Sequence, residues 1–96
     1  MTDYYALIPA YIDLKLIAEF VKKSASKGKI IQKDKNHYEV AYTDEYGDKY
    51  RMYLDGFQGD YHMISCTGAE GNVLELNKII KQFGGMLFKD NWKRRN

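Results

Sequence analysis

The sequence predicts an α+β fold: a two-layer sandwich in which a mostly antiparallel sheet, with a four-stranded central meander plus terminal strands, is covered on one face by two helices. Apolar residues recur at helical spacing in two segments, one on each side of the meander. Between them, from Lys29 to Thr67, the apolar pattern has a period of two and is interrupted by turn residues. The chain has 96 residues, of which 45% are apolar and 29% charged, so we expect one globular domain spanning 1–96.

The first two elements are a strand and a helix. Residues 4–8 favour a short strand that ends at Pro9, because proline is confined to strand ends and edges. Asp13 is a suitable N-cap for the helix that follows, and we expect Gly28 to terminate that helix in a left-handed conformation. The apolar stripe of this helix consists of Leu14, Ile17, Ala18 and Val21.

The centre of the chain is expected to form an antiparallel meander. Its four strands are predicted near residues 29–33, 37–43, 49–54 and 61–67. The turns between them are predicted at residues 34–36, 44–48 and 55–60.

A second helix and a last strand complete the fold. Asn72 and Glu75 have the spacing of a capping box after the loop 68–71, and Gly84-Gly85 stops the helix. Residues 86–88 are predicted to form the last strand, and we treat 93–96 as a candidate disordered basic tail. The buried side of the helix is expected to contain Val73, Leu76, Ile80 and Phe83.

Alternation within the strands assigns each side chain to one face of the sheet. The residues expected to face the helices are Tyr38, Val40, Tyr42, Tyr50, Met52, Leu54, Ile64 and Cys66. The opposite, helix-free face is then expected to carry Arg51, Tyr53, Tyr61 and Met63, with Phe57 at the tip of the adjoining loop. Tyrosine, methionine and arginine are enriched in the cores of protein interfaces. A solvent-facing sheet also uses aromatic residues simply for cross-strand packing, which is the alternative interpretation.

These residues favour a small, non-enzymatic binding protein of the inhibitor, immunity or accessory type, with another protein as its partner. The acidic loops of the meander would set the electrostatic register of that contact. A homodimer formed through the same aromatic patch is a further hypothesis.

Nucleic-acid binding is the alternative function. Residues 1–36 carry a net charge of +3 and residues 78–96 a net charge of +5, whereas residues 37–77 carry −6. Basic side chains combined with an aromatic ring are typical of proteins that contact phosphates and stack on bases. The residues that would form this surface are Lys22, Lys23, Lys27, Lys29, Lys33, Lys35, Trp92, Lys93, Arg94 and Arg95.

The sequence gives little support to chemistry at a metal or cofactor. Cys66 is the only cysteine, and four residues along a strand separate it from His62, about 13 Å at ~3.3 Å per residue, too far for one zinc ion. The nucleotide motifs GxGxxG and GxxxxGK[ST] are absent, and the two GxxG segments, 56–59 and 68–71, are typical turn sequences. We expect no cofactor and no catalytic residue. The sequence also lacks the pattern of a signal peptide or a membrane span, so we expect a cytoplasmic protein that does not bind membranes.

Overall fold

We describe a computed structural model of the chain, which defines residues 3–24, 26–43, 47–66 and 71–90. The order of elements is the predicted one, strand, helix, four strands, helix, strand. Their bounds are β1 (Asp3–Pro9), α1 (Leu14–Ser24), β2 (Ser26–Asp34), β3 (His37–Thr43), β4 (Lys49–Gln58), β5 (Tyr61–Cys66), α2 (Gly71–Phe83) and β6 (Met86–Asp90).

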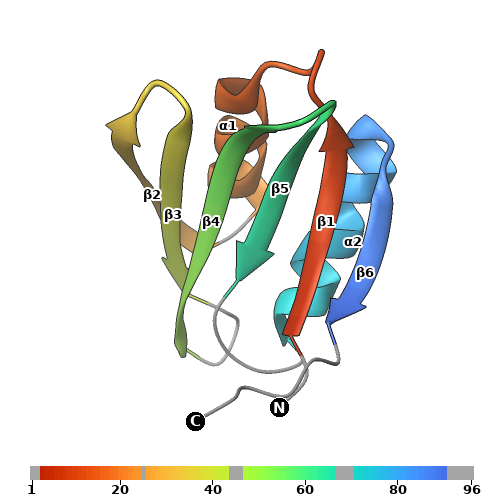
Figure 1. Cartoon of the computed structure of the whole chain (residues 1–96). Helices are drawn as coiled ribbons and strands as arrows, with labels where there is room; N and C mark the ends of the chain where they lie inside the picture. Colours follow the sequence, from red (N-terminus) through yellow and green to blue (C-terminus); the bar gives the residue numbers. More distant parts are fainter. Residues whose placement is uncertain (1–2, 25, 44–46, 67–70, 91–96) are drawn as a thin grey trace, which may run out of the picture.

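The strands form one six-stranded sheet in the order β2-β3-β4-β5-β1-β6, and every pairing in it is antiparallel. Both helices lie on the same face, behind the sheet in Figure 1. Helix α1 packs against β2, β3 and β4, whereas α2 packs against β1, β5 and β6. The predicted two-layer α+β sandwich is therefore confirmed.

The core lies between the sheet and the two helices. Met52, Leu54 and Ile64 are fully buried there, as their alternation predicted. The pattern in β3 is equally regular, because Tyr38, Val40 and Tyr42 are buried and their neighbours are not. Other side chains that fill this layer include Ala6, Ile8, Leu14, Ile17, Ala18, Val21, Leu76 and Ile79.

The end of the first helix was predicted wrongly. Helix α1 ends at Ser24, and Gly28 lies inside β2 instead of terminating the helix. The glycine is needed for a close approach, because a Cβ at this position would lie 2.8 Å from the Lys22 carbonyl oxygen. The left-handed conformation falls on Lys27, with φ of 53°, where β2 has a shift in register between Ser26 and Lys29.

The hairpin between β4 and β5 also differs from the prediction. The predicted turn over 55–60 is shorter, since β4 continues to Gln58 and only Gly59 and Asp60 form the turn. The register shifts between Asp55 and Gln58, so two residues of β4 bulge opposite one residue of β5. The N–H of Gly56 in this bulge donates to the Asn36 carbonyl at 2.7 Å, which ties the hairpin to the β2–β3 turn.

Candidate functional site

The helix-free face of the sheet carries the side chains that alternate with the core. The pairing register places them in rows that cross several strands. One row contains Tyr53, Ser65, Tyr5 and Phe88, and the next contains Asp55, Met63, Leu7 and Met86. A third row pairs Tyr61 with Pro9 near the turn. These rows bring β1 and β6, which lie far from the meander in the sequence, into the same surface as β4 and β5.

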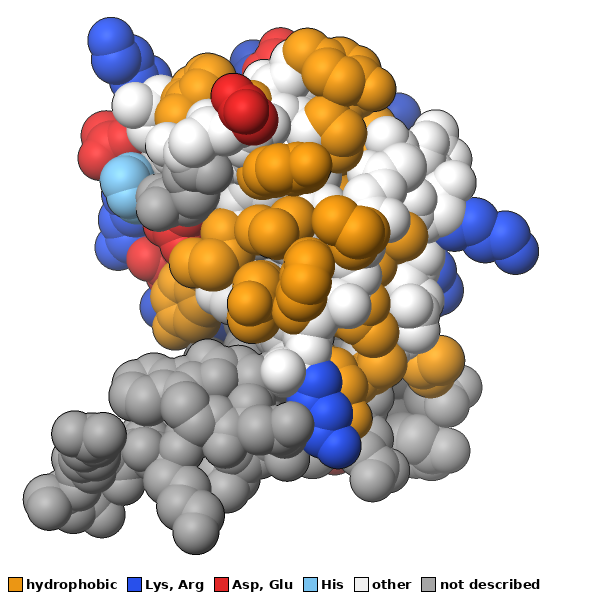
Figure 2. Space-filling view, turned by 45° about the vertical axis from the view of Figure 1, so that its right-hand side comes forward, with side chains coloured by type: hydrophobic (Ala, Val, Ile, Leu, Met, Phe, Trp, Pro, Cys, Tyr) orange, Lys and Arg blue, Asp and Glu red, His pale blue; other side chains and the backbone are white. Residues whose placement is uncertain are grey.

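We call the part of this face on β5, β1 and β6 the uncharged strip. Tyr61 is 37% exposed and Met86 is 52% exposed, whereas the remaining members are half-buried against one another. The rings of Tyr5 and Phe88 stack with centroids 5.4 Å apart and an angle of 15° between their planes. The strip consists of Tyr5, Leu7, Pro9, Tyr61, Met63, Ser65, Met86 and Phe88. Figure 2 shows hydrophobic side chains gathered in the middle of this side of the molecule, with charged side chains at the margins.

The other part of the same face, on β2, β3 and β4, is charged. Arg51 donates from Nη1 to Glu39 Oε1 at 3.0 Å, and Lys33 Nζ lies 3.6 Å from the other oxygen of Glu39. Lys29 and Lys49 extend this basic region toward the far end of the strands. We call Lys29, Lys33, Lys49 and Arg51 the basic margin.

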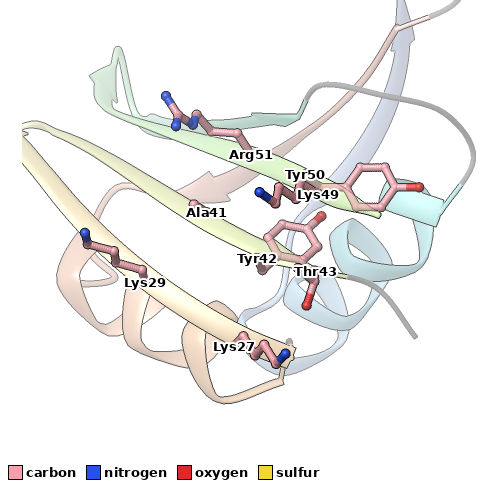
Figure 3. Close-up of a pocket in the computed structure, with 8 residues that line it drawn as sticks. All are labelled: Lys27, Lys29, Ala41, Tyr42, Thr43, Lys49, Tyr50 and Arg51. Atoms are coloured by element: carbon pink, nitrogen blue, oxygen red, sulfur yellow. The ribbon is translucent and has the colours of Figure 1, made fainter. Parts of the chain in front are cut away.

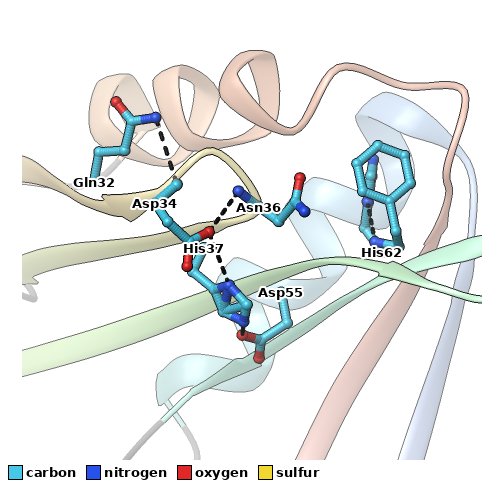
Figure 4. Close-up of polar contacts among 7 residues, drawn as sticks. Gln32, Asp34, Asn36, His37, Asp55 and His62 are labelled. Atoms are coloured by element: carbon cyan, nitrogen blue, oxygen red, sulfur yellow. Dashed lines mark hydrogen bonds and ion pairs between the residues drawn. The ribbon is translucent and has the colours of Figure 1, made fainter.

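A histidine network lies at the turn end of the charged part (Figure 4). His37 Nδ1 lies 3.1 Å from Asp34 Oδ1, and His37 Nε2 lies 3.4 Å from Asp55 Oδ1. Asp34 also accepts from the Asn36 N–H at 2.8 Å, which closes the β2–β3 turn. These contacts join neighbouring strands, so they hold the charged part of the face in place.

The bulge of β4 presents Phe57 to solvent. Phe57 has φ of 61° and is 59% exposed. Its N–H donates to Nδ1 of the fully buried His62 at 3.2 Å, and the two rings meet edge to face at 5.0 Å. His62 Nε2 lies 2.7 Å from the Ile12 carbonyl, which can only accept, so Nε2 carries the proton and donates. His62 therefore holds both the bulge and the segment before α1.

The protein-binding residues predicted from the sequence are distributed as follows. Arg51, Tyr53, Tyr61 and Met63 lie on the helix-free face, and Phe57 lies in the bulge. The prediction did not include the residues that β1 and β6 add to the same surface. Alternation of Tyr5, Leu7 and Pro9 is visible in the sequence, but the insertion of β1 between β5 and β6 is a non-local pairing that this pattern does not specify.

The lysines proposed for nucleic-acid binding do not form one cluster. Lys22 and Lys23 lie at the end of α1, and Lys27 and Lys29 lie at the adjacent start of β2. Strand β2 then carries the chain away, so that Lys33 and Lys35 lie at its other end. Trp92, Lys93, Arg94, Arg95 and the tail 93–96 lie outside the described residues, as do residues 68–70 of the second GxxG segment.

Among residues 3–24, 26–43, 47–66 and 71–90, no group of three or more His, Cys, Asp and Glu side chains is placed to hold a metal ion. None of the helices in these segments has the length and apolar character needed to cross a membrane.

Comparisons of the chain with protein-family models, with curated proteins and with solved structures give no match.

Proposed function

We propose that this chain is a small, non-enzymatic cytoplasmic protein that acts by binding another protein through the uncharged strip. The observation that carries the proposal is the register of β5, β1 and β6, which collects outward-facing apolar side chains from three neighbouring strands. Phe57 and Tyr61 extend the contact toward the β4–β5 turn.

The composition of the strip is unusual for a face that only meets water. Antiparallel sheets with one solvated face normally alternate apolar inward residues with polar outward ones. Here the outward positions that β1 contributes to the strip are Tyr5, Leu7 and Pro9, although the inward positions Ala6 and Ile8 already contribute to the core. Cross-strand packing explains the stacking of Tyr5 on Phe88. It does not explain seven apolar residues among the eight that form the strip, so burial against a second surface is the better explanation.

The basic margin indicates the chemistry of the partner. Lys29 and Lys49 have no carboxylate of a described residue within 4.0 Å, and Glu39 contacts both Lys33 and Arg51. A partner whose apolar surface has an acidic border matches both parts of the face. A second copy of this chain matches less well, because the border of its own strip is the basic margin and not an acidic one.

Affinity capture from the native host, with nuclease treatment, tests the proposal through matched variants. Met63→Glu and Met86→Glu place a charge in the strip, at its centre and at its edge. Leu16→Glu and Leu74→Glu are the controls, because these leucines are 57% and 66% exposed on the two helices. We expect the wild type and both control variants to capture the same protein. The amount captured by the strip variants should be lower by roughly tenfold or more, because interface anchors contribute ~2 kcal/mol or more to binding.

Thermal unfolding shows whether each variant is folded, and Met86 on the edge strand β6 provides the variant with the least risk to the fold. The proposal fails if folded Met63→Glu and Met86→Glu capture the same protein as the wild type. It also fails if light scattering shows a wild-type dimer that both strip variants convert to monomers, since the strip would then be occupied by a second copy.

A further inference from the structure

Exposed aromatic side chains gather at the end of the sheet where β4 turns into β5. Among the described residues, six large apolar side chains are exposed, and Tyr11, Phe57 and Tyr61 are three of them. Tyr11 is 84% exposed, the highest value of the six. These three residues come from the β4–β5 hairpin and from the connection between β1 and α1, which meet at this end of the sheet (Figure 1). We call them the aromatic tip.

Hydrogen bonds join the two segments of the aromatic tip. The Ala10 N–H donates to the Asp60 carbonyl at 2.9 Å, and His62 donates to the Ile12 carbonyl at 2.7 Å. The backbone on both sides of Tyr11 is therefore bonded to the hairpin. The aromatic tip is one fixed surface and not a pair of independent loops.

The backbone of Phe57 has a conformation that favours glycine. Its φ of 61° lies in the left-handed region, which bulky side chains rarely adopt and glycine adopts at no steric cost. The glycine of this bulge is at position 56 instead, where a Cβ would lie 3.1 Å from Leu14 Cδ2 and 3.2 Å from the Asn36 carbonyl oxygen. The chain thus carries a ring where its backbone favours none. Such backbone strain clusters at binding sites and ligand clamps.

Packing within the protein does not account for the ring of Phe57. The ring meets the His62 ring at a centroid distance of 5.0 Å, yet Phe57 remains 59% exposed. The contact with His62 covers only part of the ring. The remaining apolar surface is available to a second molecule, and its burial there would be favourable.

The aromatic tip also carries an acidic group. Asp60, in the turn between β4 and β5, is exposed, and no cationic group of a described residue lies within 4.0 Å of its carboxylate. A surface that covers the tip therefore matches it best when a basic side chain faces Asp60.

The far end of the meander has basic side chains. A pocket of about 420 Å³ lies there on β2, β3 and β4, and no described acidic residue lines it (Figure 3). Its basic lining residues are Lys27, Lys29, Lys49 and Arg51. A partner with a basic group over Asp60 and acidic groups over this far end can lie along the sheet in one direction only.

We propose that the Phe57 ring inserts into a concave apolar cleft of the partner, with a basic residue of the cleft rim facing Asp60. The inference rests on the proposed function, because it names the part of the partner protein that the contact requires. A protruding ring is buried only by a concave surface, so the partner is a folded protein with a cleft and not an extended peptide. Aromatic rings that fill such clefts carry much of the energy of an interface.

The bulge contributes to binding by fixing the position of this ring in advance. The Phe57 N–H donates to the buried His62, so the backbone is already ordered in the free protein. Less conformational freedom is then lost when the partner binds.

Affinities for the captured partner, measured by calorimetry after its purification, test the proposal. Phe57→Gly and Phe57→Ala both remove the ring, and we expect each to weaken binding by about thirtyfold or more, the loss typical of an anchor residue. Phe57→Trp should weaken binding by roughly tenfold, because a fitted cleft does not accept a larger ring. The control Leu16→Ala, at an exposed helix position, should bind as the wild type does.

Urea denaturation separates the role of the ring from that of the backbone. We expect Phe57→Gly to unfold at a higher urea concentration than Phe57→Ala, because only glycine relieves the left-handed backbone. The two variants should nevertheless bind equally weakly. Binding that follows stability, retained by Phe57→Gly and lost by Phe57→Ala, would overturn the role of the ring.

The rim of the cleft is tested by the association rate. Asp60→Asn keeps the size of the side chain and removes its charge, and we expect association to slow several-fold at low salt. An unchanged rate would overturn the basic rim.

The strip variants Met63→Glu and Met86→Glu, measured in parallel, distinguish the failure of this inference from that of the proposed function. Weak binding by the strip variants together with full binding by Phe57→Gly and Phe57→Ala overturns the inference alone. Weak binding by the Phe57 variants with full binding by the strip variants supports the tip as the anchor and overturns the strip as the contact. Full binding by both sets, or no captured protein, overturns both. Equal or tighter binding by Phe57→Trp overturns the cleft, since a flat contact accepts a larger ring.

Discussion

Replacing His62 with leucine tests how the bulge that presents Phe57 is held. The side chain is fully buried and uses both ring nitrogens, accepting from the Phe57 N–H at 3.2 Å and donating to the Ile12 carbonyl at 2.7 Å. Leucine occupies a similar volume but leaves both backbone groups unpaired.

An unpaired buried donor or acceptor costs about 1–3 kcal/mol, so two of them cost ~2–6 kcal/mol. Ile12 and Phe57 are partly exposed, and water replaces some of the lost bonding, so we expect a loss of ~2–3 kcal/mol in the free energy of unfolding. Domains of this size are stable by only ~5–15 kcal/mol, so the loss is large enough to measure.

Urea denaturation of His62→Leu and of the matched control His37→Leu measures this difference. His37 is half-exposed, and its partners Asp34 and Asp55 can return to water, so its replacement should cost about 1 kcal/mol or less. An equal loss of unfolding free energy in the two variants would refute the argument, because the buried hydrogen bonds of His62 would then contribute no more than the exposed contacts of His37. In His62→Leu we also expect faster hydrogen exchange at the Phe57 amide.

The remaining predictions concern the packing of the sheet and are measured by the same unfolding assay. Gly85→Ala should cost ~2–5 kcal/mol, because the new Cβ would collide with the Leu7 carbonyl oxygen and φ is +156°. Gly59→Ala, with φ of +67° and open space around it, should cost only ~1–2 kcal/mol, and a cost equal to that of Gly85→Ala would contradict the steric argument. Gly28→Ala should cost ~1–3 kcal/mol, since its Cβ would lie 2.8 Å from a backbone oxygen at the end of α1. Ile64→Ala should cost ~2–5 kcal/mol at this fully buried position, and a smaller loss would mean that the core collapses around the cavity.

Much of the fold follows from local patterns in the sequence. Alternation in β3, β4 and β5 is enough to bury Val40, Met52 and Ile64 and to turn Tyr53 and Tyr61 outward, because neighbouring side chains of a strand must face opposite ways. Such patterns depend only on residues close together in the chain, which is why the predicted two-layer sandwich is confirmed.

The features that shape the candidate sites depend on contacts between distant residues. We predicted that α1 ends at Gly28, because glycine often follows the last residue of a helix. In the structure α1 ends at Ser24, and Gly28 lies in β2, where its backbone packs so closely on Lys22 that a Cβ would not fit. The bulge at Phe57 depends on His62 across the hairpin. The pocket on β2, β3 and β4 depends on Ala41 lying between Lys29 and Arg51 on the neighbouring strands. A sequence pattern read one segment at a time does not specify these pairings.

The methionine methyl groups provide the most direct measurement of the proposed contact. Met63 and Met86 lie in the uncharged strip, and Met52 is fully buried in the core as an internal control. With methyl-labelled methionine and a saturating amount of the captured partner, we predict that the signals of Met63 and Met86 shift while that of Met52 stays in place. Unchanged signals from Met63 and Met86 in the formed complex would contradict the central claim that the partner binds the helix-free face.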